Sequence, residues 1–322
     1  MSELSLQQEL EQQISETAWG ASPESLYEPI QYIMSLGGKR LRPMLTLMGY
    51  SLYKDDPEEI IPYAVAVEAF HNFTLMHDDI MDKAPLRRGV KTVHEKWNVN
   101  TAILSGDVML VKVYDTLSEL EPKLLKEALP LFNKCATEVC EGQQWDMEFE
   151  TMKTVTTAQY LEMIRQKTAV LLGFALEFGA LLAGANKKNR DVIKSLGVNI
   201  GIGFQLNDDL LDVYGDKKTF GKQVGGDIIA NKKTFLLIRA LERAKGKEKT
   251  ELQKWLTATK FDKTKKVKAV TAIYDKLEIK AITESEINNY FSKGLQNLAQ
   301  LPASASRDAL GQQIMQLMNR TK

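Results

Sequence analysis

The sequence contains little cysteine and no excess of either charge. Cys135 and Cys140 are the two cysteines among 322 residues, which excludes a disulfide-stabilised scaffold and fits a reducing cytoplasm. Five positions apart in a helical pattern, they lie on different faces, so we expect small buried hydrophobic groups and no disulfide. Lys plus Arg and Asp plus Glu total 42 each, so the composition gives no support for nucleic-acid binding. The lysine-rich segment 245–268 is interpreted as solvated helices and a loop.

Long hydrophobic runs are also absent from the sequence. The most apolar stretch, Ala169 to Ala185, is slightly short for a membrane span and carries Glu177 near its middle. We interpret it as a buried core helix and expect no transmembrane segment. The N-terminal residues, MSELSLQQELEQQ, lack the apolar core of a signal peptide, so we expect a cytoplasmic protein.

Proline is scarce after residue 130. Eight of the nine prolines occur by Pro130, and the last is Pro302, so long uninterrupted helices are allowed in residues 131–301. Apolar residues recur mostly at helical spacing, and no run of alternating strands with hairpin turns is found. The sequence therefore predicts an all-α fold, with a single domain over residues 1–322 built from about a dozen helices.

Two aspartate clusters interrupt otherwise apolar helical segments. They occur in the sequences HNFTLMHDDIMD and GIGFQLNDDLLDVYGD, and both have the spacing i, i+1, i+4: Asp78, Asp79 and Asp82, then Asp208, Asp209 and Asp212. Residues i and i+4 share one helix face with Cβ atoms about 5–6 Å apart, so two carboxylates there can share a small hard cation. Because apolar residues surround the acids, we expect them in a deep cleft. Mg²⁺ typically combines one or two carboxylates with substrate phosphates, so the pattern predicts a Mg²⁺-bridged diphosphate between two helices.

Basic residues near these clusters would suit a second anion. They are Lys39 and Arg42 after a Gly-Gly pair, Arg87 and Arg88 after the first cluster, and Lys167, Lys222 and Lys232 further along. Each alone is most simply a surface charge, but together they can hold two diphosphates. His71 shares a helix face with Asp78 and is either a core histidine or a phosphate contact. Gln205, with Phe204, precedes the second cluster by about one turn and is either core or a neighbour of a developing cation.

The chain resembles the trans-isoprenyl diphosphate synthase (polyprenyl synthetase) family from about Gly37 to Thr234. The segments that carry the resemblance are GGKRLRP, HDDIMDKAPLRRG, GQQWD, QKT, FQLNDDLLD and GKQVGGDIIANKKT. The resemblance implies an all-helical fold around a deep central cavity, usually in a homodimer, with three Mg²⁺ ions. One departure is Asn231, where family members commonly carry Gly; Asn tolerates positive φ better than most residues, so the loop is expected to survive.

The resemblance also implies roles for individual residues. Asp78 and Asp82 match metal ligands assisted by Asp79, and Asp208 matches a main ligand supported by Asp209 and Asp212. The residues that match the isopentenyl diphosphate site are Lys39, Arg42, His71 and Arg88. Those that match the allylic diphosphate site are Arg87, Lys167, Lys222 and Lys232, while Thr168 and Gln205 match residues lining the reacting carbon. The implied reaction ionises the allylic diphosphate, condenses the cation with isopentenyl diphosphate and eliminates a proton.

Product length is expected to depend on Phe73 and Thr74, which lie five and four residues before Asp78. That separation is about 6–7.5 Å along a helix, on the order of one or two isoprene units. In the family, one aromatic residue at the Phe73 position goes with C20 products, so we expect geranylgeranyl diphosphate, with farnesyl diphosphate as the alternative. A terpene cyclase and a non-catalytic partner subunit are the remaining alternatives; the cations of the second diphosphate pocket count against the former.

Overall fold

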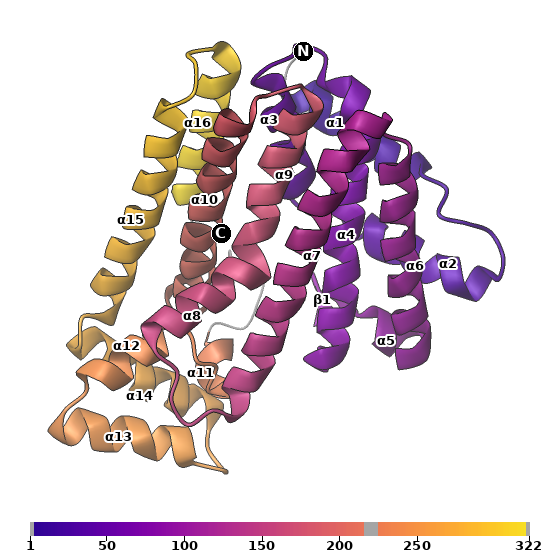
Figure 1. Cartoon of the computed structure of the whole chain (residues 1–322). Coiled ribbons are helices and arrows are strands. Elements are labelled where there is room, and N and C mark those ends of the chain that lie inside the picture. Colours follow the sequence, from indigo (N-terminus) through magenta and orange to yellow (C-terminus); the bar gives the residue numbers. More distant parts are fainter. Residues whose placement is uncertain (1–2, 216–224, 320–322) are drawn as a thin grey trace. The chain divides into compact units, whose positions relative to one another are not determined.

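The computed structural model describes residues 3–215 and 225–319. Nearly all of these residues are helical or lie in the turns between helices (Figure 1). Within these two ranges the only strands are β1 (Leu86–Arg87) and β2 (Val90–Lys91), which pair antiparallel as a short hairpin. The predicted all-α fold is confirmed.

The residues group into two compact units. The first unit comprises Met1–Cys135 and Phe174–Lys194, and the second comprises Ala136–Gly173 and Ser195–Lys322. Three long helices contribute residues to both units: α7 (Pro122–Thr151), α9 (Val170–Leu182) and α10 (Lys187–Tyr214). A single domain over the whole chain stays a prediction, as does the deep central cavity.

The first unit is built around α4, whose side chains are buried on most of its circumference, as its apolar composition predicts. Helix α6 packs along α4 (Figure 1). It begins at an Asn98 cap, whose side chain accepts a hydrogen bond from the Thr101 N–H at 2.9 Å. The elements of this unit are α1 (Glu3–Glu16), α2 (Glu24–Ser35), α3 (Leu41–Ser51), the 3₁₀ turn η1 (Pro57–Ile60), α4 (Ile61–Met81), β1, β2, α5 (Val93–Lys96) and α6 (Val99–Ser118).

The second unit contains a helix that changes its winding partway. Helix α8 begins with a capping box between Thr156 and Gln159 and continues directly into a π-helical turn, η2, and then into α9. The elements of this unit are α8 (Thr157–Ile164), η2 (Arg165–Ala169), α11 (Gly226–Ala230), α12 (Phe235–Arg243), α13 (Gly246–Thr257), α14 (Lys263–Lys276), α15 (Ile279–Ala299) and α16 (Ala305–Met318).

The apolar stretch from Ala169 to Ala185 forms α9 and its flanks, and its side chains are buried. Glu177 is 1% exposed and lies 3.1 Å from the ammonium of Lys194, which compensates the buried charge. The interpretation as a core helix is confirmed. No described helix combines the length and the apolar character needed to cross a membrane.

Two expectations about single residues are wrong. Both cysteines are free, as expected, but only Cys135 is buried, while Cys140 lies on an exposed face of α7. The lysine-rich segment forms α13, the start of α14 and the loop between them, and most of its residues are exposed, as expected. Lys266 is the exception, because it is fully buried. Its ammonium donates to the Ile229 carbonyl and to the Asn231 side chain.

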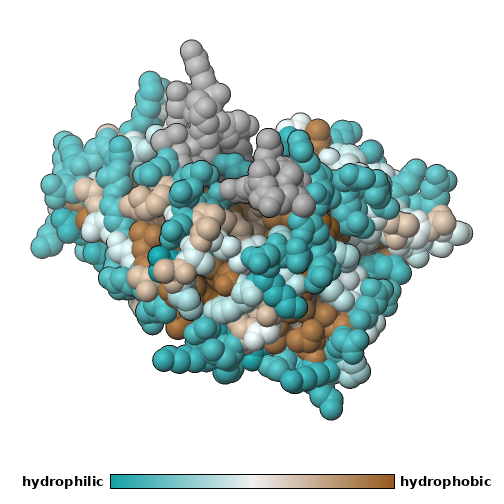
Figure 2. Space-filling view, turned by 90° about the horizontal axis from the view of Figure 1, so that it is seen from above, coloured by the Kyte–Doolittle hydropathy of each residue, from teal (hydrophilic) through white to brown (hydrophobic). Residues whose placement is uncertain are grey.

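The face drawn in Figure 2 is mostly hydrophilic, with hydrophobic residues gathered in smaller areas.

Candidate active site

The first aspartate cluster lies at the C-terminal end of α4, where the chain turns back through the β1–β2 hairpin. Arg88 and Gly89 have φ values of 53° and 82° and form the two-residue turn between the strands; two positive φ values are typical of a type I′ turn, which suits the strand twist. The hairpin returns Arg87 to the helix, where Nε and Nη2 each donate to the Asp79 carboxylate at 2.7 Å. This bidentate pair fixes both side chains.

Four arginines lie near His71, which is about two turns before the aspartates on α4. The Nη1 group of Arg42 donates to His71 Nε2 at 3.0 Å, so the imidazole proton lies on Nδ1. Burial lowers the pKa of His71 well below its usual value. The charges of the nearby guanidinium groups add to this effect: Arg42, Arg87, Arg88 and Arg40. His71 is therefore neutral at physiological pH, and the surplus positive charge around it favours an anion.

The Gly-Gly turn before α3 makes room for one of these guanidinium groups. A Cβ atom at Gly38, whose φ is 142°, would lie 2.9 Å from Arg88 Nη2. Arg88 donates to the carbonyl of Gly37, and Lys39, the next residue along, is exposed. The turn and the hairpin thus bring the predicted residues Arg42, His71 and Arg88 together in the first unit, and Lys39 lies next to them in the sequence.

In the second unit, Lys167 and Lys232 both pair with the carboxylate of Asp146, a residue for which the sequence predicted no role. The Asp146 Oδ2 atom lies 2.6 Å from Lys167 Nζ and 3.7 Å from Lys232 Nζ. Burial would raise the pKa of Asp146, but the two ammonium groups outweigh it and lower the pKa below its usual value. The shared carboxylate holds two cations side by side, 65 positions apart in the sequence.

Glycine contacts place the residues of the π-helical turn. A Cβ atom at Gly142 of α7 would lie 2.7 Å from Lys167 Cα, and one at Gly201 of α10 would lie 2.6 Å from Ala169 Cα. Both neighbouring helices therefore approach the turn more closely than any side chain would allow. Four residues after each glycine is a residue that contacts a side chain of η2. Asp146, after Gly142, accepts from Lys167 Nζ. Gln205, after Gly201, accepts from Thr168 Oγ1 through its Oε1 atom at 3.1 Å. π-Helical turns occur frequently at functional sites.

The second aspartate cluster lies on α10, and its middle member is engaged inside the protein. Asp209 accepts hydrogen bonds from Tyr160 Oη and from Gln205 Nε2, the latter at 3.1 Å. Burial and the nearby Asp227 raise the pKa of Asp209 to about 7, against the opposing effects of these hydrogen bonds and of Lys232. The local excess of negative charge favours a cation.

The two clusters follow the same plan. In each, the second aspartate is almost fully buried, at 3% for Asp79 and 6% for Asp209, and is hydrogen-bonded by protein side chains. The first and fifth positions are more exposed: Asp78, Asp82, Asp208 and Asp212. The Asp82 N–H donates to the Asp78 carbonyl at 2.9 Å, so the helical i, i+4 relation holds even at the end of α4.

These carboxylates fit Mg²⁺ by the chemistry of their donor atoms, because this ion prefers oxygen ligands. In residues 3–215 and 225–319, no three His, Cys, Asp or Glu side chains converge closely enough to hold a metal ion by themselves. Mg²⁺ typically keeps several waters and combines one or two carboxylates with substrate phosphates.

The segment after the second cluster carries Asn231 and Lys232. The Asp227 N–H at the start of α11 donates to Asp212 Oδ2 at 3.0 Å. Asn231 ends this helix with φ of 55°, so the expectation that Asn takes the place of a positive-φ glycine is confirmed. Its side chain also accepts from Lys266 Nζ at 2.6 Å and donates to the Leu256 carbonyl at 3.1 Å. Lys222 lies outside the described residues.

Phe73 and Thr74 lie on α4, one turn deeper than the aspartates. The Phe73 ring is 4.8 Å from the ring of His77 and 5.8 Å from that of Phe70, and Thr74 Oγ1 donates to the His71 carbonyl at 2.8 Å. Phe73 is held by these ring contacts, as a blocking residue would need to be. Its role in product length stays a prediction.

Sequence reasoning missed three residues of the second unit: Asp146, Tyr160 and Asp227. Asp146 and Asp227 lie in the segments GQQWD and GKQVGGDIIANKKT that carry the family resemblance, so their position alone was a usable signal. Tyr160 precedes the QKT segment by about two turns, and no local pattern distinguishes it from a core tyrosine.

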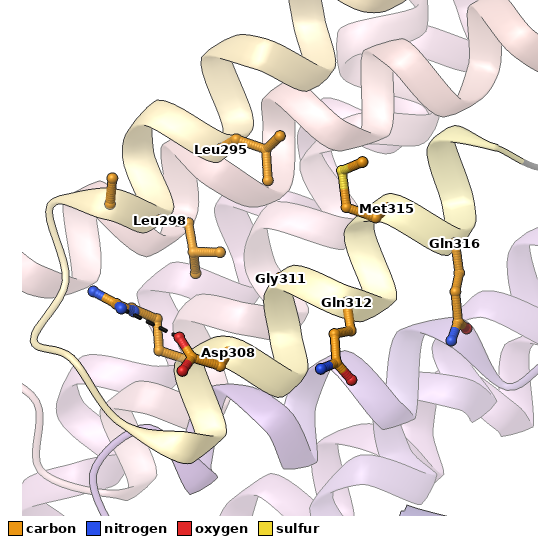
Figure 3. Close-up of a pocket in the computed structure, with 9 residues that line it drawn as sticks. Leu295, Leu298, Asp308, Gly311, Gln312, Met315 and Gln316 are labelled. Carbon is orange, nitrogen blue, oxygen red and sulfur yellow. Dashed lines mark hydrogen bonds and ion pairs between the residues drawn. The ribbon is translucent and has the colours of Figure 1, made fainter.

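A separate groove contains none of these residues. It lies between α15 and α16 and has a volume of about 710 Å³. Leu295, Leu298 and Met315 lie between the two helices in Figure 3, and Arg307 pairs with Asp308 at one end. Its mixed lining offers no cluster of charges for a diphosphate.

Comparison with known proteins gives matches over the same segments. A family model described as polyprenyl synthetase matches residues 23–274, which include both aspartate clusters. A geranylgeranyl diphosphate synthase from Methanosarcina mazei is 43% identical over 223 residues, 69% of each chain. A crystal structure of a geranylgeranyl pyrophosphate synthase is 41% identical, covers 100% of both chains and superposes with a TM-score of 0.95. A polyprenyl synthase from Caulobacter crescentus CB15, crystallised with calcium and isoprenyl diphosphate, is 26% identical over 99% of this chain and 95% of its own, with a TM-score of 0.87.

Proposed function

Because the chain belongs to the polyprenyl synthetase family of prenyltransferases, we propose that it lengthens an allylic diphosphate by adding isopentenyl diphosphate. The observation that carries the proposal is the gathering of arginines around a neutral histidine, next to the aspartates that end α4. Arg40 and Arg87 are paired with carboxylates of the protein, whereas Arg42 donates to the neutral His71 and Arg88 to a backbone carbonyl. A diphosphate matches guanidinium groups in charge and in hydrogen-bonding geometry.

The isopentenyl diphosphate pocket is proposed in the first unit. Arg42 and Arg88 supply positive charge there, Lys39 contributes an exposed ammonium, and His71 acts as a neutral hydrogen-bond partner. The histidine adds no charge of its own, so the arginines set the affinity and the imidazole sets the orientation.

The allylic diphosphate is proposed to bind Arg87, Lys167, Lys222 and Lys232. Three Mg²⁺ ions are proposed to be held by Asp78, Asp79, Asp82, Asp208, Asp209 and Asp212, and when bound they stabilise negative charge on the leaving diphosphate. Asp79 and Asp209 serve chiefly by holding Arg87, Gln205 and Tyr160 in place, because their carboxylates are already engaged by these side chains. Asp78, Asp82 and Asp208 are proposed as the main ligands. Asp212, whose Oδ2 accepts a hydrogen bond from the Asp227 N–H, is proposed to support them.

In the proposed reaction, the C–O bond of the allylic diphosphate breaks and the released diphosphate takes the bonding electrons. The double bond of isopentenyl diphosphate then attacks the allylic cation, forming one C–C bond. A proton leaves the condensed product for the released diphosphate, which restores the double bond. Thr168 and Gln205 are hydrogen-bonded to each other and present their oxygen dipoles to the carbon where positive charge develops.

The proposed product is geranylgeranyl diphosphate. Phe73 is one turn deeper than the aspartates and is packed between two other rings, so it is a rigid obstacle to a growing chain. Thr74 beside it is small and tied to the α4 backbone, which leaves room on one side. For farnesyl diphosphate to be the product, Phe73 would have to stop the growing chain one isoprene unit sooner.

A homodimer is proposed through the outer face of α6. This face exposes Val99, Ile103, Leu104, Val111 and Tyr114, with Leu104 and Val111 more than half exposed. Their positions fall within less than half of the helix circumference, and contiguous exposed apolar surface marks interaction sites. Leu104→Glu should convert the dimer to a monomer in light scattering; a monomeric wild-type protein would refute this assignment.

The test of the reaction is the dependence of allylic diphosphate consumption on isopentenyl diphosphate. With Mg²⁺, we expect farnesyl diphosphate to be consumed only when isopentenyl diphosphate is present, and Asp78→Ala and Asp208→Ala to abolish turnover. Consumption without isopentenyl diphosphate would instead identify a terpene cyclase. An inactive, folded wild-type chain would identify a partner subunit.

A further inference from the structure

Arg40 lies between two of the proposed isopentenyl diphosphate ligands, Lys39 and Arg42, but its own side chain points elsewhere. The residue is 3% exposed and precedes α3 with φ of 46°, a left-handed conformation that is unfavourable for a residue with a side chain. Such a conformation persists only where surrounding contacts determine it. The contacts of the guanidinium group therefore bear directly on the pocket.

The guanidinium group joins three helices. Nε and Nη2 donate to the two carboxylate oxygens of Glu11 on α1, at 3.0 and 3.2 Å. Nη1 donates to Glu68 of α4 at 2.9 Å, and Nη2 also donates to the Met34 carbonyl of α2 at 2.8 Å. Burial lowers the pKa of Arg40, but the two carboxylates raise it further, so the group stays charged.

Glu68 lies on the same helix as His71. The two residues are three positions apart on α4, and Asn72 Nδ2 donates to the Glu68 carboxylate at 3.2 Å. His71 in turn accepts from Arg42 at 3.0 Å. Arg40 thus ties the backbone between Lys39 and Arg42 to the helix that carries the histidine.

Glu11 is the one member of this network that comes from outside the segment matched by the family model, which begins at residue 23. We propose that Glu11, acting through Arg40, is a positioning residue for the isopentenyl diphosphate pocket. The inference rests on the proposed function, because it assumes that Lys39, Arg42 and His71 bind that substrate. Helix α1 thereby affects one substrate without touching it.

The consequence is selective for one of the two substrates. Without the Glu11 carboxylate, Arg40 keeps its hydrogen bonds to Glu68 and to the Met34 carbonyl. The left-handed backbone conformation of Arg40 then loses some of the contacts that stabilise it. Lys39 and Arg42 then sample other orientations, and binding must first reorder them. The described ligands proposed for the allylic diphosphate are held by other carboxylates: Asp79 pairs with Arg87, and Asp146 pairs with Lys167 and Lys232.

A matched control exists within the same unit. Arg190 of α10 pairs with Glu127 of α7 at 2.6 Å, with side-chain exposures of 7% and 46%; the corresponding values for Arg40 and Glu11 are 1% and 40%. Glu127→Gln therefore removes a charge pair of similar burial that includes none of the residues proposed for the pocket. It controls for the general loss of an ion pair between helices.

The experiment compares wild type, Glu11→Gln, Glu11→Asp and Glu127→Gln by steady-state kinetics for both substrates and by thermal unfolding. For Glu11→Gln we expect the KM for isopentenyl diphosphate to rise about tenfold, as for the loss of one hydrogen bond to a charged group. We expect an unchanged KM for the allylic substrate and a Tm close to that of Glu127→Gln. Glu11→Asp keeps the carboxylate, so its KM for isopentenyl diphosphate should lie between those of wild type and Glu11→Gln.

An unchanged KM for isopentenyl diphosphate in Glu11→Gln would overturn the inference. So would equal increases in both KM values, or the same kinetic change in Glu127→Gln, because either would indicate a general structural effect. A wild-type enzyme that does not consume isopentenyl diphosphate would refute the proposed function itself, which separates the two failures.

Discussion

Gly142→Ala should separate α7 from the π-helical turn and reduce activity. A Cβ atom at this position would lie 2.2 Å from Lys167 N and 2.7 Å from Lys167 Cα, both backbone atoms that cannot rotate away. Ordinary contacts begin at 3.4 Å, so the helix and the turn must move apart by about 1.2 Å to relieve the contact with Lys167 N. The movement changes the position of Lys167 relative to Asp146, whose ion pair is 2.6 Å long.

The size of the loss follows from that displacement. A misplacement of about 1 Å costs on the order of a hundredfold in rate when reacting groups must be aligned. For this displacement we expect kcat/KM for the allylic substrate to fall roughly a hundredfold, which corresponds to about 3 kcal/mol of transition-state stabilisation.

Gly311→Ala is the matched control for a glycine in a helix of the same unit. Its Cβ atom would meet the end of the Leu298 side chain at 3.2 Å, which can rotate away. Alanine is a better helix former by about 1 kcal/mol, so full activity and an equal or higher Tm are expected. The assay is steady-state turnover with far-UV circular dichroism. A folded Gly142→Ala protein with wild-type kcat/KM would refute the account of the turn.

Three further predictions concern single side chains. Phe73→Ala should lengthen the product by at least one isoprene unit in mass spectrometry, and an unchanged product distribution would reject Phe73 as the obstacle. Asn231→Gly keeps the positive φ but loses the bonds to Lys266 and Leu256, so urea unfolding should show about 2 kcal/mol less stability; equal stability would contradict this. The pKa of His71 is lowered in the folded protein, so below pH 6.5 the unfolded chain binds a proton that the folded chain does not. Wild type should therefore lose stability relative to His71→Asn between pH 7 and pH 5, and parallel curves would show that His71 titrates normally.

The sequence predicted the elements of the site better than their partners. Helical spacing and the repeated i, i+1, i+4 pattern of aspartates are local features, so the helices and the shared faces of Asp78 with Asp82 and of Asp208 with Asp212 could be read directly. The positive φ of Asn231 could also be anticipated, because it follows from the local preference of one residue type.

The ion-pair partners of the site residues could not be predicted from local sequence patterns, because they depend on tertiary contacts. Arg40 stands among three cations that look equivalent in the sequence, yet it is buried against Glu11 and Glu68. Asp146 joins two lysines that are 21 and 86 positions away. Local spacing carries no information about such distant pairs, and it equally failed to show that Cys140 faces outward.

The most direct test of the central claim is the product formed from isopentenyl diphosphate and each of the C5, C10 and C15 allylic diphosphates in the presence of Mg²⁺, measured by mass spectrometry. We expect elongation from every accepted starter, and we expect it to stop at C20. No elongation by the folded protein would contradict the proposed reaction, while products that end at C15 or extend beyond C20 would contradict the role assigned to Phe73.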